Sequence, residues 1–456
     1  MTKKITVTTS TATALTAETF SATKSCPALL ITAPGSGHGK TSITAALARF
    51  YSRQDLHVRC FKVGPDFIDP TILMQASAQA VYNLDPWIMG VEHCRQLLFD
   101  AAQTADLILI EGMMGLFDGN SSSTNSSSAD IAALFDIPIV PVIDSSAMAQ
   151  TFGAVVHGLA TYRDDMRIAG AVANRVASVG HAQMLQASLR DNVSFTAVMR
   201  SDEVVLPERH LGLQLANEIG DLDARLDALA DLLEGSALAT LPASVEFSRS
   251  ATSAVEPTLA GLTIAVACDQ AFCFLYLANL EWLQKLGAKL HVFSPLSDTH
   301  LPDVDAIYLP GGYPELHAAT LADNFEMIDA INAHVARGKP ILAECGGMLY
   351  LADTLCDLDG NEFEMLGLLP GDVMMNRKLA AIGSQEVMVD GESVRGHTFH
   401  YSSFDTDLEP LVHAVTPEGR QGEAVYQIDS ILASYLHWYF PSNPQQISKW
   451  LRGDFD

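Results

Sequence analysis

A glycine-rich stretch near the N-terminus has the residue types of a phosphate-binding loop. Residues 33–41 read A-P-G-S-G-H-G-K-T, directly after an apolar run and directly before a segment with helical spacing. Glycines let backbone N–H groups turn toward a phosphate, a helix start adds partial positive charge, and a lysine adds a full charge. The loop is a variant P-loop, because Pro34 stands where the strict pattern has its first glycine. The residues expected to bind a nucleotide are Gly35, Gly37, His38, Gly39, Lys40 and Thr41.

Four carboxylates in suitable positions predict a metal site beside this loop. They lie in F-K-V-G-P-D-F-I-D-P and in L-I-L-I-E-G-M-M-G-L-F-D-G, and they are Asp66, Asp69, Glu111 and Asp118. Acids at the carboxyl ends of parallel strands share the edge where a P-loop lies, and they can hold Mg²⁺ or its waters. We expect Thr41, Asp66 and Glu111 to be the metal ligands. Any one of these acids alone would more often be a solvated loop residue or a helix cap.

A second stretch predicts a cysteine nucleophile. Residues 340–349 read P-I-L-A-E-C-G-G-M-L, an apolar strand that stops at Cys345 and two glycines before a helix. A sharp strand-to-helix turn exposes the nucleophile, and the helix start favours a thiolate. The N–H of Gly346, with that of Gly311 or Gly312 in L-P-G-G-Y-P-E, could stabilise an oxyanion.

The partner base of this cysteine is expected far along the chain. His437, in S-Y-L-H-W-Y-F-P, is the best candidate. His397 and His400 are three apart in R-G-H-T-F-H-Y-S, where strand-forming neighbours would turn them to opposite faces, so we expect them to be structural or to line the substrate site. The other six cysteines read as small buried hydrophobic residues.

The elements that must position these residues form two α/β series. Apolar runs at 28–32, 107–110, 137–143 and 168–172 alternate with helical segments at 42–51 and 129–135, which predicts a parallel sheet covered on both faces. A second series has strands at 262–267, 306–309, 340–343 and 434–440, with a helix at 275–286. We expect residues 1–25 to be an extension, 26–240 the first domain, 241–257 a linker and 258–456 the second domain, with residues 120–128 a loop beside a site.

Composition excludes several classes of protein. The 456 residues are 48% hydrophobic and 18% charged, which excludes a disordered chain. A formal charge of −27 argues against nucleic acid or an anionic membrane as partner. Seven cysteines without a C-x-x-C pair fit a reducing cytoplasm, and no apolar run is long enough to span a bilayer.

These motifs, in this order from residue 28 to residue 450, resemble the glutamine-dependent cobyrinic acid a,c-diamide synthases of cobalamin biosynthesis. Further matching stretches are N-L-D-P-W, P-E-R-H-L-G-L and R-G-H-T-F-H-Y-S. The resemblance implies a P-loop amidoligase domain, similar to dethiobiotin synthetase, joined to a class I glutaminase-like domain. It also implies ATP, Mg²⁺, glutamine and a corrinoid polycarboxylate, cobyrinic acid, as cofactors and partners; a homodimer is left open.

The resemblance further implies a coupled mechanism. Cys345 would release ammonia from glutamine, and ammonia would displace phosphate from an acyl phosphate formed by ATP on a substrate carboxylate. Class I glutaminases usually carry an acid two residues after the base, but Tyr439 stands there, which implies a Cys–His dyad. Cys268 stands where the family often has a basic residue, and Thr398 stands where it often has a glutamate. These two differences leave undecided which residues contact the substrate.

Three alternatives compete with this interpretation. Within the class, the substrate could be hydrogenobyrinic acid or nickel sirohydrochlorin, since each presents the same acetate side chains. A nucleotide switch of the partitioning type is disfavoured, because its second lysine would fall at Gly35. A glutaminase-like binding module without catalysis is disfavoured by the presence of Cys345 and His437.

Overall fold

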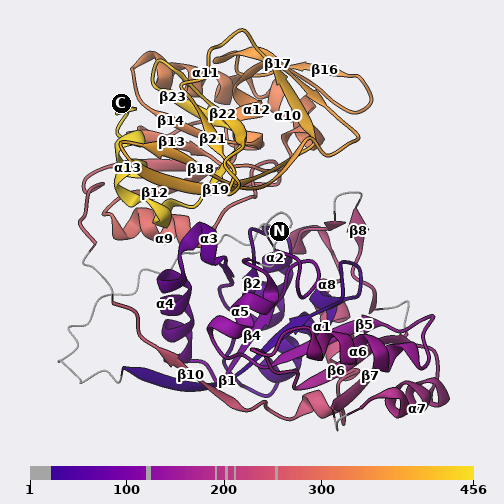
Figure 1. Ribbon diagram of the computed structural model, residues 1–456. Helices are drawn as coiled ribbons and strands as arrows, with labels where there is room; N and C mark the ends of the chain where they lie inside the picture. Colours follow the sequence, from indigo (N-terminus) through magenta and orange to yellow (C-terminus); the bar gives the residue numbers. More distant parts are fainter. Residues whose placement is uncertain are drawn as a thin grey trace.

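The computed structural model describes residues 22–119, 125–190, 193–200, 204–209, 212–251 and 255–455. Figure 1 shows two α/β units, the first in indigo to magenta and the second in orange to yellow. The predicted fold class is confirmed. In the described part of the chain, no helix is both long enough and apolar enough to cross a bilayer.

The first unit is built on a sheet with strand order β3-β2-β4-β1-β5-β6-β7, in which all neighbours run parallel. Successive residues of its strands enter different cores: Leu30 and Ile110 pack with α4 and α5, whereas Ile31 and Leu109 pack with α1, α2 and α8. Burial on both faces explains why these strands are continuous apolar runs. The strands of this unit are β1 (Thr23–Thr32), β2 (Val58–Val63), β3 (Tyr82–Leu84), β4 (Leu107–Glu111), β5 (Ile139–Asp144), β6 (Gly170–Val176), β7 (Ser194–Met199), the short pair β8 (Glu208–Arg209) and β9 (Gly212–Leu213), and β10 (Ser244–Ser248).

Helices connect these strands as the sequence periodicity predicts. The predicted helices at 42–51 and 129–135 correspond to α1 and α5. The α-helices are α1 (Lys40–Ser52), α2 (Asp69–Ser77), α3 (Pro86–Met89), α4 (Val91–Ala102), α5 (Ser128–Leu134), α6 (Thr151–Thr161), α7 (Val179–Ser188) and α8 (Leu222–Asp231), and the 3-10 helices are η2 (Ala216–Glu218) and η3 (Ala237–Ala239).

The segment expected to be a linker contributes a strand to the first unit. β10 pairs antiparallel with the first half of β1, from Thr23↔Ser248 to Pro27↔Ser244. Alternate residues of β10, Val245 and Phe247, are buried in the core beside α4. Both the predicted extension, at residues 23–25, and the predicted linker therefore include ordered strand residues. In the predicted loop at 120–128, residues 120–124 lie outside the described residues, while Ser127 caps α5 by accepting from the Asp130 N–H at 3.2 Å.

The second unit joins a parallel half-sheet to an antiparallel one. In the order β12-β11-β13-β14-β23-β22-β21-β18-β19-β24, the pairs from β12 to β23 are parallel and the rest antiparallel. A smaller sheet has the order β16-β15-β17-β20. The strands are β11 (Thr263–Ala267), β12 (Lys289–Phe293), β13 (Ala306–Leu309), β14 (Ile341–Glu344), β15 (Ala352–Cys356), β16 (Glu362–Glu364), β17 (Leu369–Met375), β18 (Ala381–Val389), β19 (Glu392–His400), β20 (Ser402–Asp405), β21 (Val412–Val415), β22 (Gln421–Ile428), β23 (Ile431–Ser434) and β24 (His437–Trp438).

One strand prediction for this unit is wrong. The run at 434–440 is not a single strand: β23 ends at Ser434, and β24 pairs antiparallel with β19 instead. The residues between β23 and β24 are buried even though the chain changes direction there. The apolar run therefore reflects burial and does not mark one continuous strand. The α-helices are α9 (Leu277–Lys285), α10 (Ala318–Asp323), α11 (Phe325–Ala336), α12 (Gly346–Leu351) and α13 (Pro444–Trp450), and the 3-10 helices are η4 (Pro314–His317) and η5 (Phe440–Ser442).

The two units share an apolar core where they meet. Tyr276, Ala278 and Tyr439 of the second unit are buried in the cluster that includes α4 and α5 of the first. Hydrogen bonds border this contact: Tyr82 Oη donates to Glu281 Oε1 at 2.5 Å, and Arg395 Nη1 donates to the Trp87 carbonyl at 2.9 Å. The contact places the carboxyl edge of the first sheet against β19 and β24.

Candidate active site

The glycine-rich loop turns between β1 and α1 as expected for a phosphate-binding loop. Gly37 and Gly39 have φ values of 79° and 94°, which glycine adopts without strain. Gly39 also lies so close to the Asn174 side chain that a β-carbon would collide with it. Asn174 Nδ2 donates to the His38 carbonyl at 2.9 Å, so a residue on β6 holds the loop from outside. No sequence motif singles out Asn174.

His38 faces the end of β5. Its Nδ1 accepts from the Asp144 N–H at 2.8 Å, which fixes the imidazole as the Nε2–H tautomer when it is neutral. Burial lowers the pKa of His38, although Asp144 opposes that shift. This placement agrees with the expectation that His38 lines the nucleotide site, and it does not support a role for His38 in acid–base catalysis.

Lys40 closes the loop on itself. Its Nζ donates to the Gly35 carbonyl at 2.9 Å and to the Met114 carbonyl at 2.7 Å. Burial and the nearby charge of Lys62 lower the pKa of Lys40 to about 8. A nucleotide phosphate would restore a full charge here by offering the ammonium an anionic acceptor.

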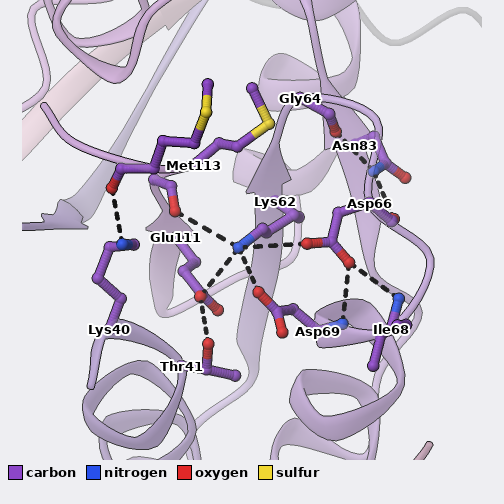
Figure 2. Close-up of polar contacts among 12 residues, drawn as sticks. Lys40, Thr41, Lys62, Gly64, Asp66, Ile68, Asp69, Asn83, Glu111 and Met113 are labelled. Carbon is purple, nitrogen blue, oxygen red and sulfur yellow. Dashed lines mark hydrogen bonds and ion pairs between the residues drawn. The ribbon is translucent and has the colours of Figure 1, made fainter. Parts of the chain in front are cut away.

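Lys62, which the sequence analysis did not single out, lies at the centre of the acidic cluster. Its Nζ lies 2.5 Å from Asp69 Oδ2, 3.0 Å from Glu111 Oε1 and 3.6 Å from Asp66 Oδ2 (Figure 2). Lys62 is 2% exposed and Glu111 is fully buried. The structure therefore brings three of the four predicted acids together around a lysine.

The charges of this cluster depend on one another. Burial opposes the charge of Lys62, but Asp69, Glu111 and Asp66 outweigh it and raise the lysine's pKa. Burial also opposes ionisation of Asp69, yet its bond to Lys62 leaves the pKa of that carboxyl lowered. Burial instead raises the pKa of Glu111 to about 8 and that of Asp66 to about 6, despite the charge of Lys62. A further cation near Glu111 would help to neutralise the three carboxylates, which share the single charge of Lys62.

The residues beside Glu111 fit a magnesium ion in part. Thr41 Oγ1 donates to Glu111 Oε1 at 2.6 Å, while Glu111 Oε2 is buried without a hydrogen-bond partner in the described residues. A hydroxyl and an orphaned carboxylate oxygen are ligands that Mg²⁺ accepts alongside phosphate oxygens and water. No group of three or more His, Cys, Asp or Glu side chains in the described residues is arranged to hold a metal by itself. Asp66 uses its Oδ1 to accept from the N–H groups of Ile68 and Asp69, at 2.9 and 3.0 Å.

Asp118 is set apart from the other acids. Its Oδ2 accepts from the Gly115 N–H at 2.8 Å, within its own loop, and the residue is exposed. It acts on the site through its charge, which supports ionisation of Lys40.

Cys345 stands on a strained turn between β14 and α12. Its φ and ψ are 41° and −109°, a conformation rare for a residue with a β-carbon. The glycines that follow are required: a β-carbon on Gly347 would collide with the Leu309 carbonyl, and one on Gly346 would lie 2.8 Å from the Gly312 nitrogen. The Cys345 N–H donates to the Ser434 carbonyl at 2.7 Å, which ties the turn to β23.

The predicted base lies beside this cysteine. A β-carbon on Gly311 would collide with the His437 ring and would lie 3.3 Å from Cys345 Cβ, so one glycine separates the two side chains. Burial, and then Glu315, raises the pKa of Cys345, while the Gly346 N–H lowers it by a smaller amount. The start of α12 thus favours the thiolate as expected, but burial outweighs its effect and leaves the pKa of Cys345 raised. Burial and the neighbouring His397 hold the pKa of His437 well below its ordinary value, so the resting pair is a thiol and a neutral imidazole.

Two backbone amides converge next to Cys345. A β-carbon on Gly346 would lie 2.8 Å from the Gly312 nitrogen, so the backbones of these two residues are close together. Among the described residues, the Gly312 N–H has no hydrogen-bond acceptor. Its neighbours are paired instead: the Tyr313 N–H donates to the Ala271 carbonyl, and the Gly311 carbonyl accepts from the Phe274 N–H. The arrangement fits an oxyanion hole made by Gly312 and Gly346.

Among the residues that the structure describes, no carboxylate hydrogen-bonds Nδ1 of His437. Tyr439, two residues later, points to the first unit, where its hydroxyl lies 3.2 Å from His93 Nε2. Glu344 is buried nearby, but it accepts from the Trp438 N–H at 3.0 Å and from Tyr308 Oη at 2.8 Å. Within the described residues, His437 Nδ1 has no hydrogen-bond partner.

The two other histidines lie on β19, as the sequence predicts. His397 stacks on His437 at 4.9 Å between ring centroids, and Tyr276 Oη lies 3.0 Å from its Nδ1. Burial lowers the pKa of His397 to about 3. His400 instead bonds Glu423 Oε1 at 3.0 Å and stacks on Tyr435.

One cavity of about 560 Å³ connects both sets of residues. Asp66, Phe67 and Met113 line it from the first unit, and Cys345 and His437 line it from the second. Its volume suits a substantial organic ligand. The predicted nucleophile of the second unit and an acid of the first thus line the same cavity.

Comparisons with known proteins match both units. Residues 29–213 match the family described as the CobQ/CobB/MinD/ParA nucleotide binding domain, and residues 263–445 match the CobB/CobQ-like glutamine amidotransferase domain. A hydrogenobyrinate a,c-diamide synthase of Stutzerimonas stutzeri (strain A1501) is 53% identical, covering 94% of this chain and 99% of its own. One of Pseudomonas aeruginosa is 53% identical over 92% of this chain and 96% of its own. A cobyrinate a,c-diamide synthase of Herminiimonas arsenicoxydans is 48% identical over 93% of this chain and 96% of its own.

Proposed function

The chain belongs to the cobyrinate and hydrogenobyrinate a,c-diamide synthases, carbon–nitrogen ligases with a glutamine amidotransferase domain, and from that premise we propose how its residues carry out amidation. The substrate is cobyrinic acid, whose a and c acetate carboxylates become amides at the expense of ATP and glutamine. Hydrogenobyrinic acid is the second candidate, because both relatives at 53% identity bear its name.

The reaction at the second unit begins with a proton transfer. His437, held neutral by burial, takes the proton of the Cys345 thiol as the sulfur attacks the side-chain amide of glutamine. The N–H groups of Gly312 and Gly346 stabilise the oxyanion. His437 then protonates the leaving ammonia, and water hydrolyses the thioester with His437 again as base.

The reaction at the first unit activates a carboxylate. The loop at 33–41 and Lys40 bind the ATP phosphates. A substrate carboxylate oxygen attacks the terminal phosphorus to form an acyl phosphate, and ADP leaves with the electron pair of the broken phosphorus–oxygen bond. Thr41 and Glu111, with Asp66 and Asp69 around Lys62, would hold Mg²⁺, which would neutralise phosphate charge when bound. Ammonia attacks the acyl carbon, and phosphate leaves with the electron pair of the broken carbon–oxygen bond.

The observation that carries this proposal is the shared cavity. Cys345 and His437 face the same cavity as Asp66, so ammonia released at one unit has only this cavity to cross before it meets an activated carboxylate at the other. Amidation with glutamine and with ammonium chloride tests the coupling directly.

In this experiment, Cys345→Ala should abolish the glutamine-dependent reaction and retain the ammonia-dependent one. Cys356→Ala is the matched control, since Cys356 lies on β15, outside the residues that line the cavity. Loss of both reactions in Cys345→Ala, with Cys356→Ala unaffected, would contradict the division of labour between the two units.

A further inference from the structure

Phe67 crosses from the first unit into the glutaminase site of the second. Its ring stacks on Phe274 at 5.2 Å and 9°, and lies 4.6 Å from Tyr276, 5.4 Å from His397 and 5.1 Å from His437, between centroids. All four partners belong to the second unit. Phe67 is therefore an aromatic residue of one unit inserted into a socket of the other.

The socket matters because His437 lacks the usual means of orientation. In a nucleophile–base pair, a third group normally fixes the ring of the base. In His437, Nδ1 has no hydrogen-bond partner among the described residues. The two side chains that could have served as that third group are paired elsewhere. The Tyr439 hydroxyl lies against His93, and Glu344 accepts from Trp438 and Tyr308.

Ring packing takes the place of that third group. His437 is flanked by His397 at 4.9 Å, by Phe274 at 6.0 Å and by Phe67. Buried rings in close contact have few alternative rotamers, so a complete set of neighbours holds an imidazole that no hydrogen bond orients. Of these three neighbours, Phe67 alone comes from the first unit.

We propose that Phe67 is a positioning residue for His437, through which the first unit completes the glutaminase site. This inference rests on the proposed function, because it requires His437 to be the base of Cys345. Removing the ring would open space beside His437, and the imidazole could then leave the orientation in which it accepts the thiol proton.

The turn that carries Phe67 is held by the acidic cluster. Asp66 Oδ1 accepts from the Ile68 and Asp69 N–H groups, the two that follow Phe67, and Asn83 Nδ2 donates to the Asp66 carbonyl at 2.9 Å (Figure 2). Lys62 binds both acids of the turn. The position of the ring in the glutaminase site is thus set by the same residues that form the predicted synthetase site.

The test compares Phe67→Ala and Phe67→Leu with Phe67→Tyr, which keeps the ring. In the full chain, steady-state amidation is measured against glutamine and against ammonium chloride, together with the rate at which iodoacetamide alkylates Cys345. We expect the two ring-less variants to lose about tenfold or more in kcat with glutamine, while the KM for glutamine changes by less than about threefold. The ammonia-dependent rate should fall less than the glutamine-dependent rate, alkylation should slow, and Phe67→Tyr should restore glutamine use.

Tyr82→Phe is the control for a general loosening of the contact between units. It removes the hydrogen bond to Glu281 without touching the socket, and it should leave glutamine use near wild type. An unchanged kcat with glutamine in both ring-less variants would overturn the proposal. So would equal losses with glutamine and ammonia, failure of Phe67→Tyr to restore activity, or the same loss in Tyr82→Phe. Absence of glutamine-dependent amidation in the wild-type protein would instead refute the proposed function.

Discussion

Lys62 and Glu111 are paired in register on neighbouring parallel strands, and the lysine Nζ lies 3.0 Å from the glutamate Oε1 at their carboxyl ends. The same oxygen accepts from Thr41 at the start of α1. Glu111 therefore links the phosphate-binding loop to the acidic cluster. Because neither Lys62 nor Glu111 is accessible, their charges must be satisfied by each other and by the groups that bind there.

Replacing Lys62 should damage both stability and synthesis. Lys62→Met leaves Asp66, Asp69 and Glu111 without their shared cation, and breaking a buried ion pair typically costs about 3 to 5 kcal/mol. Amidation should fall with either nitrogen source. Lys449→Met, which removes an exposed pair with Asp390, should change the free energy of unfolding by less than about 1 kcal/mol. Urea unfolding and the two amidation assays measure this; equal, small effects of the two variants would contradict a central role for Lys62.

Removing the hydroxyl of Thr41 should change the magnesium requirement. Thr41→Ala deletes the partner of Glu111 Oε1 and one proposed ligand, so a higher Mg²⁺ concentration should be needed for half-maximal ATP-dependent synthesis. Thr44→Ala is the matched control, because Thr44 lies on the same helix and bonds only the Lys40 carbonyl. If the magnesium dependence of Thr41→Ala matched that of Thr44→Ala, Thr41 would not be a ligand.

His437 Nδ1 has no carboxylate partner in the described part of the chain, which leads to a prediction about Tyr439. His437→Asn should abolish glutamine use and spare the ammonia-dependent reaction. Tyr439→Phe removes only the hydroxyl that faces His93, so glutamine-dependent kcat should stay within about threefold of wild type. Steady-state kinetics decide the matter: a loss in Tyr439→Phe as severe as that in His437→Asn would mean that the tyrosine completes a triad.

A buried histidine far from both sites predicts the pH dependence of stability. Burial lowers the pKa of His334 to about 4, so the folded state stays neutral while the unfolded state takes up a proton below its ordinary pKa of 6.5. Stability should therefore fall as pH decreases from 6.5 to about 4, by up to about 1.4 kcal/mol per pH unit from this residue. His334→Gln should reduce that slope in urea unfolding at several pH values. An unchanged slope would mean that His334 is protonated in the folded protein.

Much of the parallel architecture was predictable, because its signals are local. Strands buried on both faces, such as β4 and β13, are continuous apolar runs, and Cys345 with its two glycines marks a strand-to-helix turn by composition alone. The predicted partners Cys345 and His437 lie 92 positions apart in the sequence, yet the residue types suggested their pairing.

The missed residues act through contacts between distant segments. Lys62 sits within an apolar strand, and only the pairing of β2 with β4 shows that its ammonium meets Glu111. Phe67 reads as an ordinary apolar residue until the two units are docked and it enters the ring cluster around His437. The raised pKa of Cys345 could not be foreseen for a similar reason, since the burial that causes it depends on the whole site.

Mass spectrometry of the amidated product tests the central claim most directly. Cobyrinic acid, hydrogenobyrinic acid and nickel sirohydrochlorin are incubated in parallel with the purified protein, Mg-ATP and glutamine. The account predicts two successive replacements of a hydroxyl by an amino group on a corrinoid, cobyrinic or hydrogenobyrinic acid. ATP hydrolysis without a mass change on any of the three substrates would contradict it.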